Sequence, residues 1–276
     1  MIRESVKLCL LGHPVAHSLS PRLMSRLGRL TRRKVVYRAC DVLPERLACA
    51  VELMRWSGML GGNVTVPHKV AIVPLLDALT PEARLAGAVN AVRCSQGRLI
   101  GHNTDAAGFA DALQDADFKA AGCDALIFGA GGGARAAACA LGRLRARRVT
   151  IAARRPQAAR ALARAMAASF PHTAFAAGRS AAADLAVNAT PLGLPGFPDR
   201  SPAPIGWSGC VLALDLVYGR RTTFQRQARS LGARALGGSG MLVSQALRSW
   251  EFWFGPLGAA RRAALKCRIL EGLACP

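Results

Sequence analysis

A glycine-rich stretch carries the first residues whose types and spacing suit a chemical task. Residues 126–135 read LIFGAGGGAR, with glycines at 129, 131, 132 and 133 after a short apolar run. Closely spaced glycines after a strand let the backbone approach a pyrophosphate, whose charge then meets the free amides at a helix N-terminus. Glycine clusters also occur in ordinary strand-to-helix turns, so this stretch alone leaves both interpretations open.

The next apolar run narrows the choice of nucleotide. It reads RVTIAARR over residues 148–155 and ends in Arg154 and Arg155. A dinucleotide fold that binds NAD usually places a carboxylate here for the ribose hydroxyls, whereas a guanidinium pair matches the 2′-phosphate of NADP. The alternative is that these are two more surface arginines in an arginine-rich chain.

The N-terminal half holds short polar clusters around a rare lysine. Lys69, in NVTVPHK (63–69), is one of five lysines among 37 basic residues. A lysine can exchange a proton where an arginine cannot, although most lysines simply lie on solvated surfaces. HSLSP (17–21) offers two hydroxyls that suit either a carboxylate or a helix cap, with Ser20 as the cap and Pro21 as the first helical residue. GHNTDAAGF (101–109) supplies Asp105, which taken alone would cap the following helix.

These clusters need elements to position them, and the pattern predicts parallel α/β architecture. Apolar runs that look like strands alternate with Ala- and Leu-rich helical segments. A proline-rich stretch, 192–207, is predicted to be a loop, and a domain boundary is expected near residue 103. Strands are predicted at 6–12, 34–40, 59–65, 88–94, 124–129, 148–153, 184–189 and 210–216.

Composition limits the class of protein. No apolar run is long enough to cross a bilayer, and the short apolar start reads as a first strand rather than a signal peptide. Nine scattered cysteines without a CxxC pair favour a reducing, cytoplasmic setting. The formal charge of +21 suggests a protein that binds nucleic acid. The arginines are dispersed, however, and no nucleic-acid-binding motif is present, which argues against that role. The five histidines form no pair suited to binding a metal, so no metal is expected. His17, His68 and His102 are expected to be turn residues with solvated rings; the alternative is a minor role in proton transfer.

Seven motifs together resemble one family. HSLSP, NVTVPHK, GAVNAV, NTDAAGF, GAGGGAR, NATPLG and GMLVSQA follow one another from residue 17 to 246. In this order they resemble the shikimate dehydrogenase family, which includes quinate/shikimate members. The resemblance covers nearly the whole chain.

The resemblance implies an α/β fold with two domains and an active-site cleft between them. Residues 1–103 and 241–276 would form the substrate-binding domain, and 104–240 a Rossmann-type domain for NADP. It implies a reversible NADPH-dependent reduction of 3-dehydroshikimate to shikimate, in the pathway to aromatic amino acids. The partner would be this small molecule rather than nucleic acid or a membrane, and the chain would be a monomer or a homodimer.

The resemblance also implies roles for single residues. Lys69 and Asp105 would be the catalytic pair, Lys69 delivering a proton and Asp105 orienting it while binding a hydroxyl. The substrate would be bound by Ser18, Ser20, Asn63, Thr65, Asn90, Asp105, Tyr218 and Gln245. The cofactor would be bound by Gly129, Ala130, Gly131, Gly132, Gly133, Ala134, Arg154, Arg155, Thr190, Leu216 and Gly238.

The sequence also departs from the family pattern. Ala153, Arg154 and Arg155 stand where many members have Asn-Arg-Thr, so two hydrogen-bonding side chains are lost and one charge is gained. Ala91 and Ala106 replace a common Thr and Gly, and the turn after Tyr218 lacks the proline found in some relatives. These changes leave open a quinate/shikimate enzyme with broader hydroxy-acid or NAD use, and a relative that binds NADP or shikimate without turnover.

Overall fold

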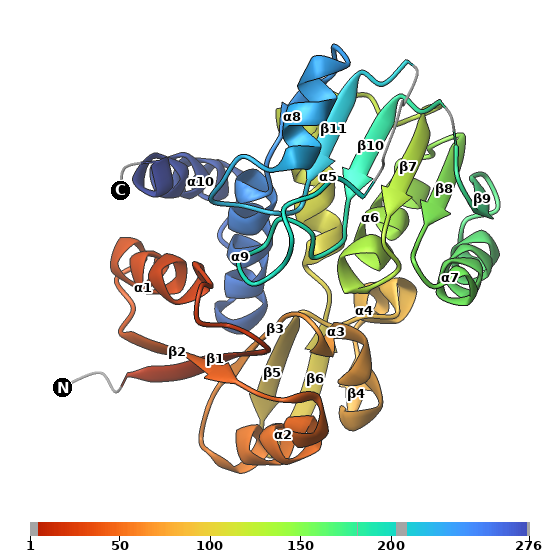
Figure 1. Cartoon of the computed structure of the whole chain (residues 1–276). Coiled ribbons are helices and arrows are strands. Elements are labelled where there is room, and N and C mark those ends of the chain that lie inside the picture. The colour runs from red at the N-terminus through yellow and green to blue at the C-terminus, as the bar shows by residue number, and fades with distance from the viewer. Residues whose placement is uncertain (1–4, 181, 203–208, 275–276) are drawn as a thin grey trace. The chain divides into compact units, whose positions relative to one another are not determined.

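The chain folds into two compact units. The structure is a computed structural model that describes residues 5–180, 182–202 and 209–274. The first unit joins residues 1–104 to 243–276, and the second is residues 105–242. Both are α/β units, and Figure 1 labels most of their elements. Of the predicted loop, residues 192–202 contain neither helix nor strand, and 203–207 lie outside the described residues.

The first unit is built on a six-stranded mixed sheet. Its strand order is β2-β1-β3-β5-β6-β4, with β1 parallel to β2 and β3, and β5 antiparallel to β3 and β6. The strands are β1 Val6–Gly12, β2 Val35–Asp41, β3 Gly61–Val64, β4 Ala78–Leu79, β5 Ala91–Ser95 and β6 Arg98–His102. The helices are α1 Ser20–Leu30, α2 Leu47–Trp56, α3 His68–Ala71, α4 Pro81–Ala86 and α10 Ala259–Ala274, with single 3-10 turns at Pro44–Arg46 and Val73–Leu75.

The antiparallel part of this sheet differs from the predicted parallel pattern, and its cause is local. Gln96 and Gly97, which join β5 to β6, both have positive φ angles, of 50° and 72°. Two such residues give the tight turn whose twist matches an antiparallel hairpin. The first unit therefore adds a hairpin to a parallel β1–β2–β3 core, in which Cys9, Leu11 and Val64 pack against α2.

The second unit is built on a six-stranded sheet in which every pair is parallel. Its order is β12-β11-β10-β7-β8-β9. The strands are β7 Asp124–Phe128, β8 Arg148–Ala152, β9 Ala174–Ala177, β10 Leu185–Asn188, β11 Leu212–Asp215 and β12 Arg234–Leu236. The helices are α5 Asp105–Asp115, α6 Gly132–Arg143, α7 Pro156–Ser169 and α8 Thr223–Ser230; α9 Ser239–Phe254 begins here and continues into the first unit.

This strand order has one point where the direction of winding reverses. Counted from β7, the six strands lie in the order 6-5-4-1-2-3, which is that of a Rossmann fold, and the reversal lies between β7 and β10. Ligands of open parallel sheets bind at such a point, beyond the carboxyl ends of the strands. One face is packed by Leu126 and Phe128 against Phe224 of α8, with the two phenyl rings 6.2 Å apart and edge-on.

Every helix among the described residues is too short or too polar to span a membrane.

Candidate active site

The two serines of HSLSP lie where α1 begins. Ser20 is the first residue of α1, so the prediction that Ser20 caps this helix is wrong: the cap position is Leu19, whose side chain makes no capping bond. The Ser18 hydroxyl instead accepts a hydrogen bond from the Ser20 amide at 3.2 Å. Both serines are partly exposed, and the first turn of α1 contains no acidic residue. Free amides and hydroxyls therefore gather at the positive end of this helix dipole.

The segment that follows β3 positions Lys69. Asn63 is buried within β3, and the Thr65 amide donates to the Leu11 carbonyl at 2.8 Å, which extends the β1–β3 pairing. Lys69 lies on α3, where its carbonyl accepts from the Val89 amide at 2.8 Å. The short helix is thereby tied to the segment that carries Asn90.

Two of the predicted histidine environments are corrected by the structure. The His68 ring is buried and its Nε2 bonds the Val42 carbonyl at 2.7 Å, so it anchors α3 instead of being solvated. The His102 ring stacks on Phe252 with centroids 4.7 Å apart, and its Nδ1 lies 2.8 Å from the Thr80 hydroxyl. Burial lowers the pKa of His102, which favours the neutral ring. His17 is exposed, as expected of a turn residue.

Asn63, Asn90 and Gln245 share one buried network in the first unit. The Asn63 amide nitrogen donates to the Asn90 carbonyl at 2.9 Å and to the Ser249 hydroxyl at 3.0 Å. The Asn90 amide nitrogen donates to the Thr104 hydroxyl at 2.8 Å and to Gln245 Oε1 at 3.2 Å. Side chains from β3, from the segment before β5 and from α9 are thus held in one arrangement.

Three members of this network were not among the predicted site residues. The Tyr37 hydroxyl donates to Asn63 Oδ1 at 2.9 Å, the Thr104 amide donates to Asn90 Oδ1 at 2.7 Å, and the Thr104 and Ser249 hydroxyls lie 3.1 Å apart. Thr104 stands next to a predicted site residue in NTD, and Ser249 lies four residues after Gln245, one helical turn. Tyr37 gave no such signal, because β2 brings it in from an unrelated motif.

The glycine run forms the turn from β7 into α6. Gly129 has φ +114°, and a Cβ there would lie 2.7 Å from the Ala189 carbonyl oxygen. A Cβ on Gly133 would lie 3.1 Å from the Leu216 side chain, whereas one on Gly131, the cap residue of α6, would meet open space. The first turn of α6, which includes Gly132 and Ala134 and follows Ala130, contains no acidic residue. The backbone here is therefore bare and its helix end positive, which suits a diphosphate.

Arg135 in the same turn was missed as a site residue. Its Nε is buried and has no hydrogen-bond partner among the described residues, and burial lowers its pKa. A buried guanidinium nitrogen normally has an acceptor. This orphaned donor at the start of α6 adds a second sign that an anion belongs there.

The remaining predicted cofactor residues follow the carboxyl ends of strands, at the same edge of the sheet as the glycine turn. Arg154 and Arg155 follow β8 and are exposed. Thr190 follows β10, where its hydroxyl donates to Asn188 Oδ1 at 2.7 Å. The Leu216 amide donates to the Asn188 carbonyl at 3.0 Å, and a Cβ on Gly238 would lie 2.4 Å from the Leu216 carbonyl oxygen. Since the strands are parallel, all of these positions lie at the carboxyl edge of the sheet.

A buried carboxylate fixes two of the loops at this edge. Asp215, at the end of β11, accepts hydrogen bonds from the side-chain amide of Asn188 at 2.9 Å, from the backbone amide of Val217 at 3.1 Å and from the Thr222 hydroxyl. Burial raises the pKa of Asp215, although its hydrogen bonds oppose that change. The ends of β10 and β11 and the start of α8 are thereby held together, which positions Thr190 and Leu216.

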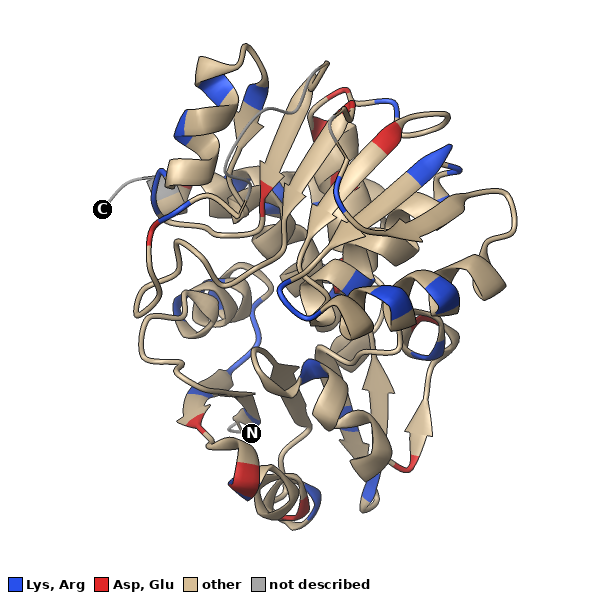
Figure 2. Cartoon of the chain, turned by 45° about the vertical axis from the view of Figure 1, so that its right-hand side comes forward, with Lys and Arg blue, Asp and Glu red and all other residues tan. Residues whose placement is uncertain are grey.

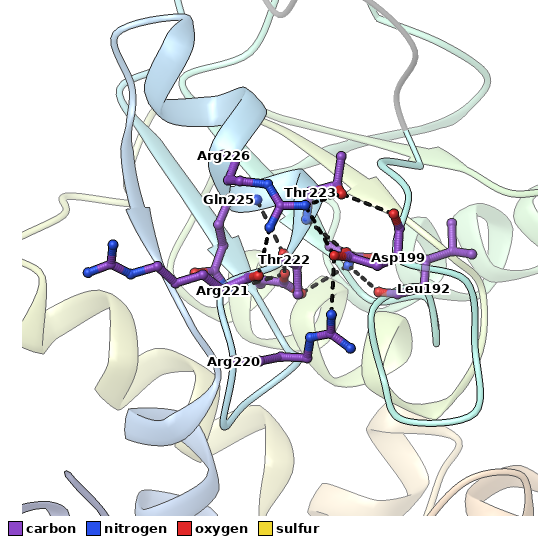
Figure 3. A network of polar contacts seen from close by, with 10 residues as sticks. Leu192, Asp199, Arg220, Arg221, Thr222, Thr223, Gln225 and Arg226 are labelled. Carbon is purple, nitrogen blue, oxygen red and sulfur yellow. Dashed lines mark hydrogen bonds and ion pairs between the residues drawn. The ribbon is translucent and has the colours of Figure 1, made fainter.

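A second, more exposed carboxylate fastens the loop after β10 to α8 (Figure 3). Asp199 accepts from the Thr223 amide at 2.8 Å and forms ion pairs with Arg220 at 3.3 Å and Arg226 at 3.1 Å. The Thr223 amide and, after it, the Arg226 guanidinium lower the pKa of Asp199.

The two units divide the predicted residues between them. The serines, Asn63, Thr65, Lys69, Asn90 and Gln245 belong to the first unit, whereas Asp105 and Tyr218 belong to the second. Asp105 is buried as the first residue of α5, and Tyr218 is partly exposed two residues after Leu216. Among the described residues, no group of three His, Cys, Asp or Glu side chains has the arrangement needed to hold a metal ion.

Comparison with known proteins identifies the relatives of this chain. Residues 10–92 match the family model of the shikimate dehydrogenase substrate binding domain. The chain is 40% identical to the shikimate dehydrogenase (NADP(+)) of Symbiobacterium thermophilum, over 96% of this chain and 95% of the relative. It is 43% identical to that of Salinibacter ruber, over 88% and 90% respectively.

The chain also matches the solved structure of a similarly named protein. Shikimate 5-dehydrogenase of Thermus thermophilus, in complex with NADP(H) and shikimate, superposes with a TM-score of 0.82 at 35% identity, covering 96% of this chain and 99% of that one. The resemblance inferred from the seven motifs is confirmed, as is the α/β fold class. This chain belongs to the shikimate dehydrogenase family.

Proposed function

We propose that this protein is an NADP-dependent shikimate dehydrogenase, an oxidoreductase that reversibly reduces 3-dehydroshikimate to shikimate with NADPH. The observation that carries the proposal is the similarity to shikimate dehydrogenases (NADP(+)) over nearly the full length of both chains. The reaction belongs to the biosynthesis of aromatic amino acids through chorismate. Residues 1–103 and 241–276 serve as the substrate-binding domain and 104–240 as the NADP-binding domain.

The start of α1 binds the substrate carboxylate. Ser18 and Ser20 contribute hydroxyls beside the free amides of an 11-residue helix, whose dipole favours an anion. Ser20 Oγ has no hydrogen-bond partner among the described residues, so it is available to a ligand. Tyr218 closes the carboxylate end of the substrate.

The asparagine network binds the ring hydroxyls, together with Thr65 and Gln245. Both amide hydrogens of Asn63 are already donated within the protein, and one Oδ1 lone pair is taken by Tyr37. An asparagine oxygen has two lone pairs, so Asn63 offers a ligand one acceptor position. A substrate hydroxyl that donates to Asn63 satisfies this position.

Lys69 and Asp105 perform the proton chemistry. NADPH, when bound, supplies the hydride that reduces the ring ketone. The Lys69 ammonium stabilises the developing alkoxide and donates the proton to it, which an arginine does not do. Asp105 orients the ammonium and accepts a hydrogen bond from the adjacent ring hydroxyl.

The glycine turn and the arginines hold the cofactor. Gly129 through Ala134 receive the diphosphate, and the bare backbone and the orphaned Arg135 Nε described above fit such an anion. Arg154 and Arg155 bind the 2′-phosphate. Thr190 and Leu216 flank the cofactor, and Gly238 allows the nicotinamide close to the backbone.

Initial rates test the proposal. Formation of reduced nicotinamide is followed by absorbance with four pairings of substrate and cofactor: shikimate or quinate, each with NADP or NAD. The expected order places shikimate with NADP first. A faster rate with quinate or NAD would instead favour the broader quinate/shikimate dehydrogenase. No change with any pairing would favour a relative that binds without turnover.

We propose that the enzyme acts in the cytoplasm as a monomer or homodimer. Its ligands are small molecules. The eight cysteines that the structure describes are all free thiols, which fits a reducing compartment. Basic residues are spread over both units rather than gathered on one element (Figure 2), which does not favour a nucleic-acid partner.

A further inference from the structure

The carboxyl ends of β8 and β9 bring a third arginine to the edge where Arg154 and Arg155 lie. The two strands are parallel neighbours, with Ile151 opposite Ala177, and the Gly178 amide donates to the Ile151 carbonyl at 3.0 Å. Neighbouring strands are about 4.8 Å apart. Arg179 follows Ala177 by two residues, so it leaves the sheet beside the segment that carries Arg154 and Arg155.

None of these three arginines is engaged elsewhere in the described part of the chain. All are exposed, and none forms an ion pair or side-chain hydrogen bond there. By contrast, Arg147 and Arg226 each pair with a carboxylate within 3.1 Å. The segments 152–160 and 177–183 contain no acidic residue that could neutralise the three charges.

The start of α7 adds to this positive edge. This 14-residue helix has Arg155 at its cap position, no side-chain capping bond within the described chain and no acid in its first turn. The amides of a first helical turn attract anions. The guanidiniums are therefore joined by a positive helix end, and nothing in the two segments supplies the opposite charge.

The order of the strands says which part of a dinucleotide would lie here. In this fold the diphosphate lies over the turn after β7, and the end of the next strand, β8, contacts the adenosine ribose. β9 lies on the far side of β8 from β7. A residue just past β9 is therefore next to the ribose 2′ position rather than the nicotinamide.

We propose that Arg179 is a specificity-determining residue that binds the 2′-phosphate of NADP together with Arg154 and Arg155. This inference rests on the proposed use of NADP. A phosphate monoester carries close to two negative charges at neutral pH and has three acceptor oxygens, so it engages more than one guanidinium. A site with three cations at the 2′ position discriminates strongly against NAD.

Binding of nucleotide fragments to the full-length protein tests the role of Arg179. Isothermal titration calorimetry measures the affinity of 2′,5′-ADP, which has the 2′-phosphate, and of 5′-ADP, which lacks it. The test variant is Arg179→Gln. The control is Arg164→Gln, which removes the same charge at an exposed position about two turns after the start of α7. Arg179→Gln is expected to lower the affinity for 2′,5′-ADP about 5-fold and the affinity for 5′-ADP less than about 2-fold. Arg164→Gln is expected to change both by less than about 2-fold.

The outcomes separate the two proposals. If the unaltered protein binds 2′,5′-ADP no better than 5′-ADP, the proposed NADP preference fails, and the role of Arg179 with it. If the unaltered protein prefers 2′,5′-ADP but Arg179→Gln keeps the same ratio, or Arg164→Gln lowers it equally, only the role of Arg179 fails. Arg179→Lys, which keeps the charge without the fork of donors, is expected to restore part of the preference.

Discussion

At the scale of single residues, the most informative side chains are those whose hydrogen bonds are already committed within the protein. Asn63 and Asn90 are both buried, and each is oriented by partners from distant segments. Such preorganisation holds the donors and acceptors of a site in place before a ligand arrives. The ammonium of Lys69 is proposed to act beside this fixed frame.

Lysine 69 is expected to contribute to turnover more than to substrate affinity. Lys69→Ala removes the charge that meets the alkoxide, so kcat should fall about 10²- to 10³-fold while KM for shikimate changes little. Lys69→Arg keeps a charge but not an exchangeable proton, so it should recover only a small part of the loss. Steady-state kinetics measure both variants. An alanine variant with near-normal turnover would remove Lys69 from the mechanism.

Cysteine 40 is expected to be an unusually reactive thiol. Cys9 and Cys40 lie on the same face of adjacent strands, and their hydrogen bond lowers the pKa of Cys40 to about 6 while it raises that of buried Cys9. A low pKa increases the fraction of Cys40 that is thiolate at pH 6, but it also makes each thiolate a weaker nucleophile. The first effect is larger, so at pH 6 iodoacetamide should label Cys40 about 10-fold faster than exposed Cys49.

Mass spectrometry of the labelled protein measures these rates, and Cys9→Ala supplies the control. Without Cys9 the thiolate of Cys40 loses its hydrogen-bond donor, so the labelling of Cys40 at pH 6 should slow while that of Cys49 stays constant. Equal rates for Cys40 and Cys49 at pH 6 in the unaltered protein would contradict the prediction.

At the scale of elements, the sequence predicted the eight strands with strong apolar runs and none of the other four. β1 was predicted at its observed bounds, and the other seven were placed within a few residues. β9 and β12 are edge strands with no buried residue, β4 has two residues, and β6 buries only every second residue. Short or half-exposed strands lack the apolar run that marks a buried one.

The sequence predicted motifs of the site better than the contacts between them. Asn63, Asn90 and Gln245 stand in recognisable motifs, but the Asn63 partners Tyr37 and Ser249 come from β2 and α9. Such contacts depend on which strands become neighbours, and local sequence does not encode that. The sequence does not mark Arg179 for the same reason, because only the pairing of β8 and β9 makes it a neighbour of Arg154.

The start of α8 is expected to depend on one hydroxyl. Thr222 caps α8 by accepting from the Gln225 amide and donates to buried Asp215. Thr222→Val removes both bonds and should lower the free energy of unfolding by about 2 to 4 kcal/mol. Thr222→Ser keeps the hydroxyl and should cost much less. Urea unfolding followed by circular dichroism compares the two, and a Val variant as stable as the Ser variant, or more stable, would mean that the hydroxyl contributes no more than the methyl group.

At the scale of the whole molecule, the first unit is completed by the end of the chain. Trp253 donates to the Val92 carbonyl at 2.9 Å, Phe252 stacks on His102, and Ser249 bonds Asn63. Residues 243–276 therefore supply part of the core and of the polar network of the first unit. The second unit draws on one continuous segment, 105–242.

A chain that ends at Leu242 is therefore expected to lose the first unit selectively. The Val92 carbonyl would lose Trp253, the Asn63 side-chain amide would lose Ser249, and the apolar surface that the C-terminal helices cover would be exposed to water, at a cost of about 25 cal/mol per Å². Limited proteolysis with mass spectrometry should show rapid cleavage within 5–104 and protection within 105–242. Equal protection of both segments would mean that residues 1–104 fold without the C-terminal helices.

The single acceptor position left on Asn63 has a consequence for inhibitor chemistry. A substrate analogue whose hydroxyl toward Asn63 is replaced by a methoxy group or fluorine would bring one acceptor against another, and would lose affinity even though its shape and polarity are nearly kept. An amino group at the same ring position keeps a hydrogen to donate. Compounds aimed at this enzyme should therefore be built with donors, not merely with polar atoms, on that side of the ring.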